Sequence, residues 1–335
     1  MSNPQQFQHP DLNDPAHQEV KVTYKQKYSL HLLLFLITFF TTTLAGLPWL
    51  NLGEGAFNLQ NFQLGLPYSI SILFILACHE FGHFFAARYH NVSATMPFFI
   101  PFPPLPGFLN FGTLGAVIRT RTAVPTKKAM FDIGIAGPIA GFIATLMVLT
   151  YGFLTLPGIE YLYTIHPEYR ELTQLPEGDL SFGSTILYWV MSQTLPDTAV
   201  SFVPPMNEIY HYPFLCVGWF GLFVTAMNLI PIGQLDGGHI AYAMFGNQHR
   251  FISRTSFATL LVIGFAGFLP LMGIDTPVGW TGWLFWAMIL YFVIKVDHPP
   301  INDPSELDSN RMMLGWLSYL MLILCFSTSP FILRL

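Results

Sequence analysis

The sequence predicts an all-α polytopic membrane protein, with about seven transmembrane helices around a three-helix core and one short extended, re-entrant β-like segment. Three observations support this fold class. The 335 residues are 52% hydrophobic and 10% charged, a balance that excludes a soluble protein with a single core. The apolar residues fall into runs of about twenty, the length that a helix needs to cross a bilayer. One further apolar segment is broken by prolines, so it cannot form a continuous helix.

Seven apolar runs follow one another along the chain, and each is predicted to form a transmembrane helix. No small-residue cleavage site follows the first run, so we expect a retained anchor rather than a signal peptide that is removed. The runs comprise residues 30–50, 67–89, 129–156, 212–232, 257–274, 278–296 and 312–333.

Lysine and arginine residues predict the orientation of these helices, because loops rich in them remain on the cytoplasmic side of a membrane. Most basic residues fall on one side of the seven-helix arrangement, together with the polar N-terminal tail. Only Arg170 and Arg334 fall on the other side, where the loop of residues 157–211 is acidic. The sequence therefore predicts a multi-pass integral membrane protein with a cytoplasmic N-terminus, in either a bacterial plasma membrane or an organellar membrane.

Two connecting segments differ from ordinary loops. Residues 91–128 are apolar but rich in proline, and their later part, residues 108–122, has strand-like side chains around Gly112 and Gly115. Backbone of this kind at membrane depth must be buried in protein or line a wet cavity, so we expect an extended element beside a site. In the acidic loop, residues 180–195 are amphipathic and predict a helix that lies at the interface or forms a partial eighth span.

The chain is expected to divide into four parts. These are a polar tail (1–28), the first transmembrane helix with its loop (29–66), a membrane core (67–240) and three additional spans (241–335). The net charge is −5 and the basic residues are scattered, which excludes a nucleic-acid-binding surface. The three cysteines lie within apolar runs and lack metal-like spacing, so we expect them to pack rather than to bind zinc or form disulfides.

The second apolar run contains the sequence His79-Glu80-Phe81-Gly82-His83. Histidines at positions i and i+4 lie on one face of a helix, so both imidazoles can bind one Zn²⁺ ion, and the glutamate between them can act on water. Ionisable residues within a membrane helix are costly unless they share a partner. A zinc ion explains all three residues together; the alternative is a pair of hydrogen-bonded core histidines and a paired glutamate.

A catalytic zinc ion keeps one position open, so we expect one further protein ligand. Asp236 is the only carboxylate near the end of the fourth apolar run, and Pro231 and Gly233 break the helix before it. The second and fourth runs cross the membrane in the same direction, which places Asp236 at the depth of His79 and His83. An Asp-Gly turn after a helix is the alternative from local sequence. The need of two histidines for a third ligand favours Asp236 in that role.

Together, the HEFGH sequence, the Asn-x-x-Pro that starts at Asn228 and the Leu-Asp-Gly-Gly-His around Asp236 resemble the site-2 protease family of intramembrane zinc metalloproteases. The resemblance covers about residues 71–239. The family core of three helices corresponds to the second, third and fourth runs, and residues 134–141 are similar to its glycine-rich helix, where small residues permit close approach. We find no loop or tail long enough for the PDZ or nucleotide-sensing domain of many relatives, so the chain is similar to the PDZ-less type.

The resemblance implies one Zn²⁺ ion per chain, bound by His79, His83 and Asp236. Glu80 is then the catalytic base, and Asn228 is a candidate donor to the oxyanion, with an interhelical hydrogen bond as the alternative. The implied function is hydrolysis of peptide bonds in or near transmembrane segments, as in regulated intramembrane proteolysis. The implied partners are transmembrane protein substrates and the lipid bilayer, with no nucleic acid. Residues 111–115 resemble the element thought to hold substrate as an added strand in PDZ-less relatives.

Two functions of other classes also fit parts of the sequence. A secondary transporter could use histidine, glutamate and aspartate within the membrane as an ion path, but the chain has no paired half-repeat and its charged groups form one ligand set. A non-catalytic protein that binds membrane proteins would have lost Glu80 or a ligand, and the chain retains the full set. A membrane HExxH protease with glutamate as third ligand is disfavoured, because the runs after Asp236 contain no glutamate.

Overall fold

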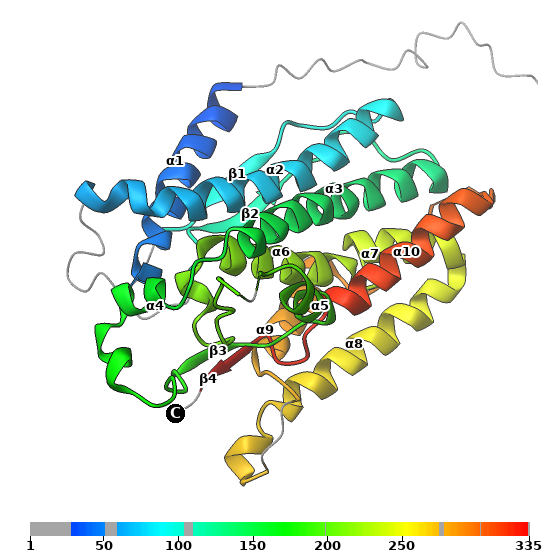
Figure 1. Ribbon diagram of the computed structural model, residues 1–335. Helices are drawn as coiled ribbons and strands as arrows, with labels where there is room; N and C mark the ends of the chain where they lie inside the picture. Colours follow the sequence, from blue (N-terminus) through cyan, green and yellow to red (C-terminus); the bar gives the residue numbers. More distant parts are fainter. Residues whose placement is uncertain are drawn as a thin grey trace, which may run out of the picture.

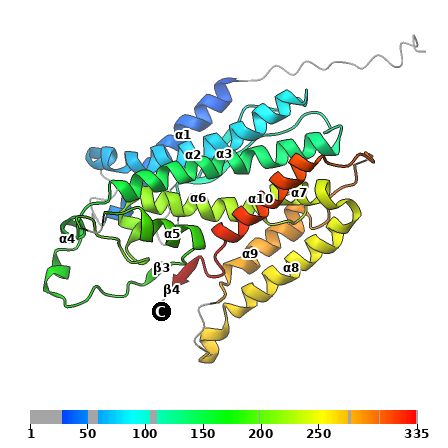
Figure 2. The ribbon, with the colours of Figure 1, turned by 45° about the vertical axis from the view of Figure 1, so that its right-hand side comes forward.

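The computed structural model describes residues 28–50, 59–103, 110–197, 199–274, 278–301 and 303–333. Its architecture is mostly helical, with two small two-stranded sheets (Figures 1 and 2). The polar tail predicted for residues 1–28 lies outside this description except for Tyr28, with which the first helix begins.

Helices α2 (Leu66–Tyr89), α3 (Lys127–Leu154) and α6 (Pro213–Leu229) form the centre of the molecule. The contact between α2 and α3 is the most extensive between any two described elements, and α6 packs against both (Figures 1 and 2). Thr126 caps α3 by accepting a hydrogen bond from the Ala129 N–H at 3.1 Å. Proline stands in the first turn of α2 and of α6, where its missing N–H costs nothing.

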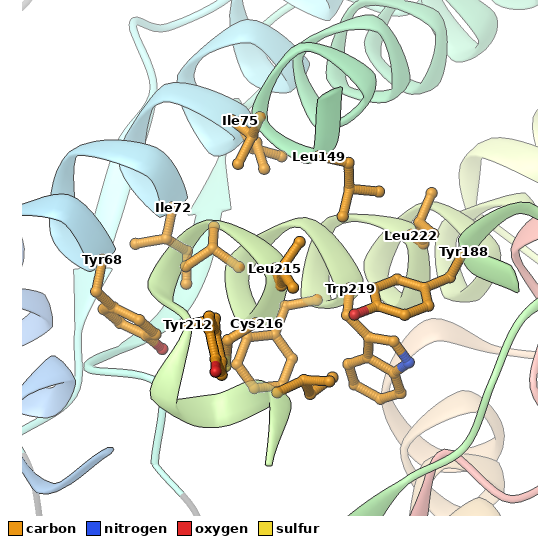
Figure 3. Packing of buried hydrophobic residues seen from close by; sticks show 14 of the residues in the cluster. Tyr68, Ile72, Ile75, Leu149, Tyr188, Tyr212, Leu215, Cys216, Trp219 and Leu222 are labelled. Carbon is orange, nitrogen blue, oxygen red and sulfur yellow. The ribbon is translucent and has the colours of Figure 1, made fainter. Parts of the chain in front are cut away.

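Large apolar side chains hold this centre together. Trp219 of α6 is fully buried, and its indole N–H donates to the Gly183 carbonyl at 2.8 Å. Figure 3 shows side chains of α2, α3 and α6 meeting around it, with Tyr188 from a neighbouring helix. Close packing of these side chains stabilises the three helices as one unit. The residues labelled there are Tyr68, Ile72, Ile75, Leu149, Tyr188, Tyr212, Leu215, Cys216, Trp219 and Leu222.

Helix α1 (Tyr28–Gly46) lies against α2 through threonines rather than through large apolar residues. The hydroxyls of Thr42 and Ser69 are 2.6 Å apart across the two helices. Thr41 donates to the carbonyl of Gly112 at 2.7 Å, which joins α1 to the segment between α2 and α3. Small polar side chains of this kind allow helices to approach closely in a membrane.

The segment predicted to be extended forms an antiparallel hairpin. Strand β1 (Phe98–Pro101) pairs with β2 (Thr113–Val117), with Phe98 opposite Val117 and Phe99 opposite Ala116. The strand-like residues around Gly115 are therefore confirmed as a strand; residues 104–109 lie outside the described part. Helix α1 covers β1, and β2 lies beside α2.

The loop between α3 and α6 is folded but contains no further span among its described residues. The stretch 180–195 was expected to form one helix; instead it begins with strand β3 (Leu180–Phe182) and continues into α5 (Ile186–Thr194). Nine residues of helix extend only about 14 Å, too short to cross a bilayer. The remaining elements of this loop are α4 (Glu160–Ile165), η5 (Pro167–Glu171) and η6 (Ile209–His211).

The C-terminal part departs from the predicted pattern of three simple spans. The run 312–333 is not one helix: α10 (Ser309–Cys325) ends before Ser327, and β4 (Phe331–Leu333) pairs with β3. Helix α8 (His249–Ala266) begins and ends eight residues before the predicted run, 257–274. The run 278–296 forms a short helix, α9 (Gly282–Ile289), with a π-helical extension, η9 (Leu290–Ile294). The remaining C-terminal elements are α7 (Asp236–Phe245), η7 (Gly246–Gln248) and η8 (Leu269–Met272). Two short 3₁₀ helices, η2 (Pro48–Leu50) and η4 (Leu59–Gly65), lie between α1 and α2.

Three helical segments of the described chain are long and apolar enough to cross a membrane. They are Tyr28–Leu50, Gln60–Tyr89 and Lys127–Leu154, whereas Pro213–Leu229 and Gly282–Ile294 are apolar but shorter. Seven spans therefore remain a prediction. Large apolar side chains also point outward on several helices, for example Leu36 of α1, Val262 of α8 and Leu320 of α10, and lipid is the natural surrounding for such surfaces.

Candidate metal centre

Two histidines of α2 and the first residue of α7 bring three potential ligand atoms together. His79 Nε2 and His83 Nε2 are 3.1 Å apart. Asp236 Oδ2 lies 3.3 Å from each of them. His79 and His83 are buried, and Asp236 is half-buried, so this triangle lies inside the protein.

The triangle has the dimensions that zinc requires. Ligand atoms about 2.0–2.1 Å from a tetrahedral zinc ion are about 3.3 Å from one another. Without a cation, two imidazole nitrogens and a carboxylate oxygen would face one another with few hydrogen-bond donors among them, so their lone pairs would repel. The residues therefore fit a zinc ion with three protein ligands.

Glycines of α3 allow the histidines to occupy this position. A Cβ atom at Gly137 would lie 2.1 Å from His83 Nε2, and one at Gly141 would lie 3.0 Å from the ring of His79. Both imidazoles thus pack directly on the backbone of α3. The glycine-rich segment 134–141 does more than bring two helices close, because it leaves the space in which the imidazoles lie.

A backbone carbonyl of the same helix orients one imidazole. His83 Nδ1 lies 2.6 Å from the carbonyl oxygen of Ile133, to which it donates a hydrogen bond. This bond places the proton on Nδ1 and leaves the Nε2 lone pair directed at the centre of the triangle, as in most zinc-bound histidines. Sequence reasoning missed Ile133, because a carbonyl that acts through the backbone has no residue-type signature.

The chain reaches Asp236 through a tight turn after α6. The fourth span was predicted to end at residue 232, but α6 ends at Leu229 because the residue before Pro231 avoids helical backbone angles. Asp236 is the first residue of α7, where a carboxylate is favoured by the helix dipole. A Cβ atom at Gly237 would lie 2.0 Å from the Leu229 carbonyl, so the returning turn packs too closely for any other residue.

Glu80 lies between this triangle and the hairpin. Its side chain is buried and lies near the backbone N–H of Ile118, directly after β2. His83 and Asp236 are its closest charged neighbours. Glu80 therefore faces both the ligand atoms and the end of the strand, a relation with Ile118 that the sequence did not reveal.

Asn228 and His239 flank the triangle on the α6–α7 side. The Asn228 side-chain nitrogen, Nδ2, is 3.3 Å from His79 Nε2. The amide nitrogen thus lies directly beside one of the ligand atoms of the triangle. His239 Nδ1 instead pairs with His298 Nε2 at 2.8 Å, so this histidine connects α7 to the segment before α10.

With this geometry in view, comparison with known proteins identifies the family. The model of peptidase family M50, the site-2 protease family, matches residues 67–271, which include the core helices and all four residues of the site. The chain belongs to peptidase family M50. The matched region begins with α2 and includes α8, so the family relationship covers more than the metal-binding sequences alone.

Three curated plant relatives carry the same indication. The probable zinc metalloprotease EGY1, chloroplastic, of Oryza sativa subsp. japonica is 31% identical over 78% of this chain and 40% of its own length. The protein of that name from Arabidopsis thaliana is 28% identical over 77% of this chain and 42% of its length. The probable zinc metalloprotease EGY2, chloroplastic, of Arabidopsis thaliana is 25% identical over 87% of this chain and 47% of its length. The chain spans less than half the length of these relatives.

Family membership and geometry agree on the cofactor. Zinc is the metal named for the M50 relatives, and the His79–His83–Asp236 triangle has the donor set and spacing that zinc accepts.

Proposed function

We propose that this member of family M50 is an intramembrane zinc metalloendopeptidase that hydrolyses peptide bonds in or near transmembrane segments of membrane proteins. Its zinc ligands are His79, His83 and Asp236, its catalytic base is Glu80, and Asn228 stabilises developing negative charge. The observation that carries the proposal is the meeting of the HEFGH helix and Asp236 in one buried triangle with sides of 3.1–3.3 Å.

Glu80 is the residue that moves protons in this account. A zinc ion at the triangle supplies Lewis-acid chemistry and makes water a stronger acid near neutral pH. Glu80 accepts a proton from the water that attacks the peptide carbonyl carbon, and it later gives that proton to the nitrogen of the leaving amine. Its burial excludes bulk water from this exchange.

Asn228 is placed to act on the other oxygen of the reaction. When water adds to the peptide bond, the carbonyl oxygen becomes negative, and a preorganised amide N–H can stabilise that charge. The Asn228 amide nitrogen beside His79 supports this role. A purely structural bond between α2 and α6 is the competing role for Asn228, and the effect of Asn228→Ala on kcat separates the two roles.

The β1–β2 hairpin supports a way of presenting substrate. A transmembrane helix has its backbone hydrogen-bonded internally, so it must unwind locally before attack, and pairing with a strand edge compensates for the lost bonds. Strand β2 leads directly to Ile118 beside Glu80, and Leu114 is 66% exposed on this strand. An unwound segment added along β2 would therefore arrive at the site.

The membrane arrangement completes the proposal. A multi-pass protein with a cytoplasmic N-terminus, a core of residues 67–240 and additional C-terminal spans at 241–335 fits the three long apolar helices and the outward-facing apolar side chains. The joining of histidine and aspartate side chains at one point does not favour an ion path, which needs polar groups at successive depths.

Cleavage of a membrane-embedded substrate by the full chain tests the proposal. The protein is reconstituted in liposomes with a single-span substrate, and Glu80→Gln is compared with Glu160→Gln, which removes an exposed glutamate paired with Arg170. Glu80→Gln is expected to reduce turnover by about 10²- to 10⁴-fold, and Glu160→Gln to leave it unchanged. Equal cleavage by wild type and Glu80→Gln would exclude the proposed mechanism.

A further inference from the structure

A second group of metal-binding side chains lies in the loop between α3 and α6. His166 stands between α4 and η5, Glu208 comes directly before η6, and His211 is the last residue of η6. One ligand atom from each lies within 4.8 Å of the other two. Glu208 and His211 are each 1% exposed and His166 is half-buried, although the group belongs to a loop.

This cluster lies far from the first triangle. His211 comes just before α6, and Asn228 stands in its last turn. Seventeen helical residues extend about 25 Å, so the two clusters lie at opposite ends of α6. The second cluster is therefore no part of the peptidase centre.

The Nδ1–H groups of the two imidazoles in this cluster point away from its centre. His211 Nδ1 donates to the carbonyl of Trp49 at 2.5 Å. His166 Nδ1 donates to Glu168 Oε1 at 2.8 Å. With each Nδ1 engaged in this way, the two Nε2 atoms face each other inside the cluster, 3.0 Å apart.

The carboxylate of Glu208 points toward the same centre. Its Oε2 lies 3.3 Å from His211 Nε2, yet it receives no hydrogen bond from the residues that the structure describes. The other oxygen, Oε1, accepts from Asn207 at 2.9 Å and from Tyr169 at 3.3 Å, so the side chain is held in this orientation. A buried carboxylate oxygen without a donor carries a substantial desolvation cost unless a cation is present.

We propose that His166, Glu208 and His211 form a second divalent-metal site, for zinc, which fastens the 157–211 loop to both the end of α1 and the start of α6. Two imidazoles and one carboxylate suit zinc, and each imidazole has the partner on its other nitrogen that bound histidines usually have. Trp49 follows α1 in η2, so a metal ion at this site fixes α1 against the start of α6.

Zinc counting on the full-length protein tests this site. The protein is produced with zinc in the medium, purified in detergent and measured by elemental mass spectrometry. Wild type is expected to hold two zinc ions per chain, Asp236→Ala one, and His166→Gln one. His90→Gln, which removes a histidine paired with Asp132 outside both clusters, is expected to retain two.

A second variant separates metal binding from a simple hydrogen-bonded cluster. Glu208→Gln keeps an oxygen for Asn207 and Tyr169 but replaces the inward oxygen by an amide that donates to the imidazoles. In the metal site it removes one zinc ion, and a chelator then lowers the melting temperature less than in wild type. In a metal-free cluster the new donor would maintain or raise the melting temperature and leave the zinc content unchanged.

The two sites fail in distinguishable ways. One zinc ion in wild type, absent from Asp236→Ala but present in His166→Gln and Glu208→Gln, overturns the second site and leaves the peptidase centre intact. Zinc that is unaffected by Asp236→Ala but lost in His166→Gln contradicts the peptidase centre instead. The zinc ion that His166→Gln retains at the peptidase centre shows that this variant is folded.

Discussion

The cluster His79–His83–Asp236 and the cluster His166–Glu208–His211 each join two histidines and one carboxylate, but they have different supports. In the first, the histidine nitrogens are 3.1 Å apart, and in the second 3.0 Å. The first is built on helices, with imidazoles packed on the backbone of α3. The second is built on loop and 3₁₀ segments, with a carbonyl and carboxylates as partners.

The surroundings, rather than the ligands, distinguish a catalytic centre from a fastening site. The first cluster has a buried glutamate, Glu80, beside it, together with the Asn228 amide and the strand β2, whereas the glutamate beside the second, Glu168, is exposed and bonded to His166. The second has Asn207 and Tyr169, which hold its own carboxylate. We therefore expect chemistry at the first and structural support at the second.

The largest expected effect comes from filling the space beside His83. Gly137→Ala places a methyl group 2.1 Å from His83 Nε2, so the imidazole has to leave its position. One zinc ion per chain and all detectable cleavage are expected to be lost, while the second cluster keeps its zinc. The control is Gly178→Ala, whose Cβ would be no closer than 3.6 Å to a neighbour. Full activity of Gly137→Ala would show that His83 lies elsewhere.

A smaller effect is expected when the amide beside the first cluster is removed. Asn228→Ala takes away a donor to the developing oxyanion, so kcat should fall by about 10²- to 10³-fold with KM and zinc content little changed. Steady-state cleavage and zinc measurements provide the check. A fall in stability without a fall in kcat would instead assign Asn228 to a structural bond between α2 and α6.

The strand beside the first cluster should affect substrate binding only. Leu114→Ala removes an exposed apolar side chain from β2, and KM is expected to rise by up to about tenfold at constant kcat. Leu320→Ala, which truncates an exposed leucine of α10, is the matched control. Equal KM values for these two variants would argue against β2 as the substrate strand.

The smallest effect on activity is expected from an ion-pair network that touches neither cluster. Arg311 of α10 binds Asp132 of α3 through two hydrogen bonds of 2.6 and 2.8 Å, and it also pairs with Asp308. Arg311→Gln should lower the free energy of unfolding by about 1.5–3 kcal/mol while both zinc ions and kcat are retained. Thermal unfolding and zinc content provide the measurement; loss of zinc in this variant would mean that α10 positions the first cluster.

The two clusters also differ in what their sequences reveal. His79, Glu80 and His83 follow helical spacing within an apolar run, and Asp236 was found because two histidines need a third ligand. The spacing of the histidines and their need for a third ligand predicted that the three side chains lie together, and the structure shows this. His166 and Glu208 are separated by loop segments without periodicity, so their proximity depends on the tertiary fold and could not be predicted.

Long apolar helices were predicted well, and short irregular elements were not. The predicted limits of α2 and α3 lie within two residues of those observed, because burial and helix propensity agree there. The prediction of a single helix over residues 312–333 was wrong. After Cys325 the chain leaves the helix, and pairing of β4 with β3 outweighs the apolar composition there. The pairing of two strands that lie about 150 positions apart in the sequence leaves no local signal in either of them.

Direct location of the zinc in the full-length protein tests the central claim most sharply. Anomalous scattering at the zinc edge, measured on crystals of the wild-type chain, gives the position of each ion relative to the side chains. The account predicts a zinc ion about 2.0–2.2 Å from His79 Nε2, His83 Nε2 and an Asp236 carboxylate oxygen. A zinc ion held by the two histidines without Asp236, or no zinc at this triangle, would contradict it.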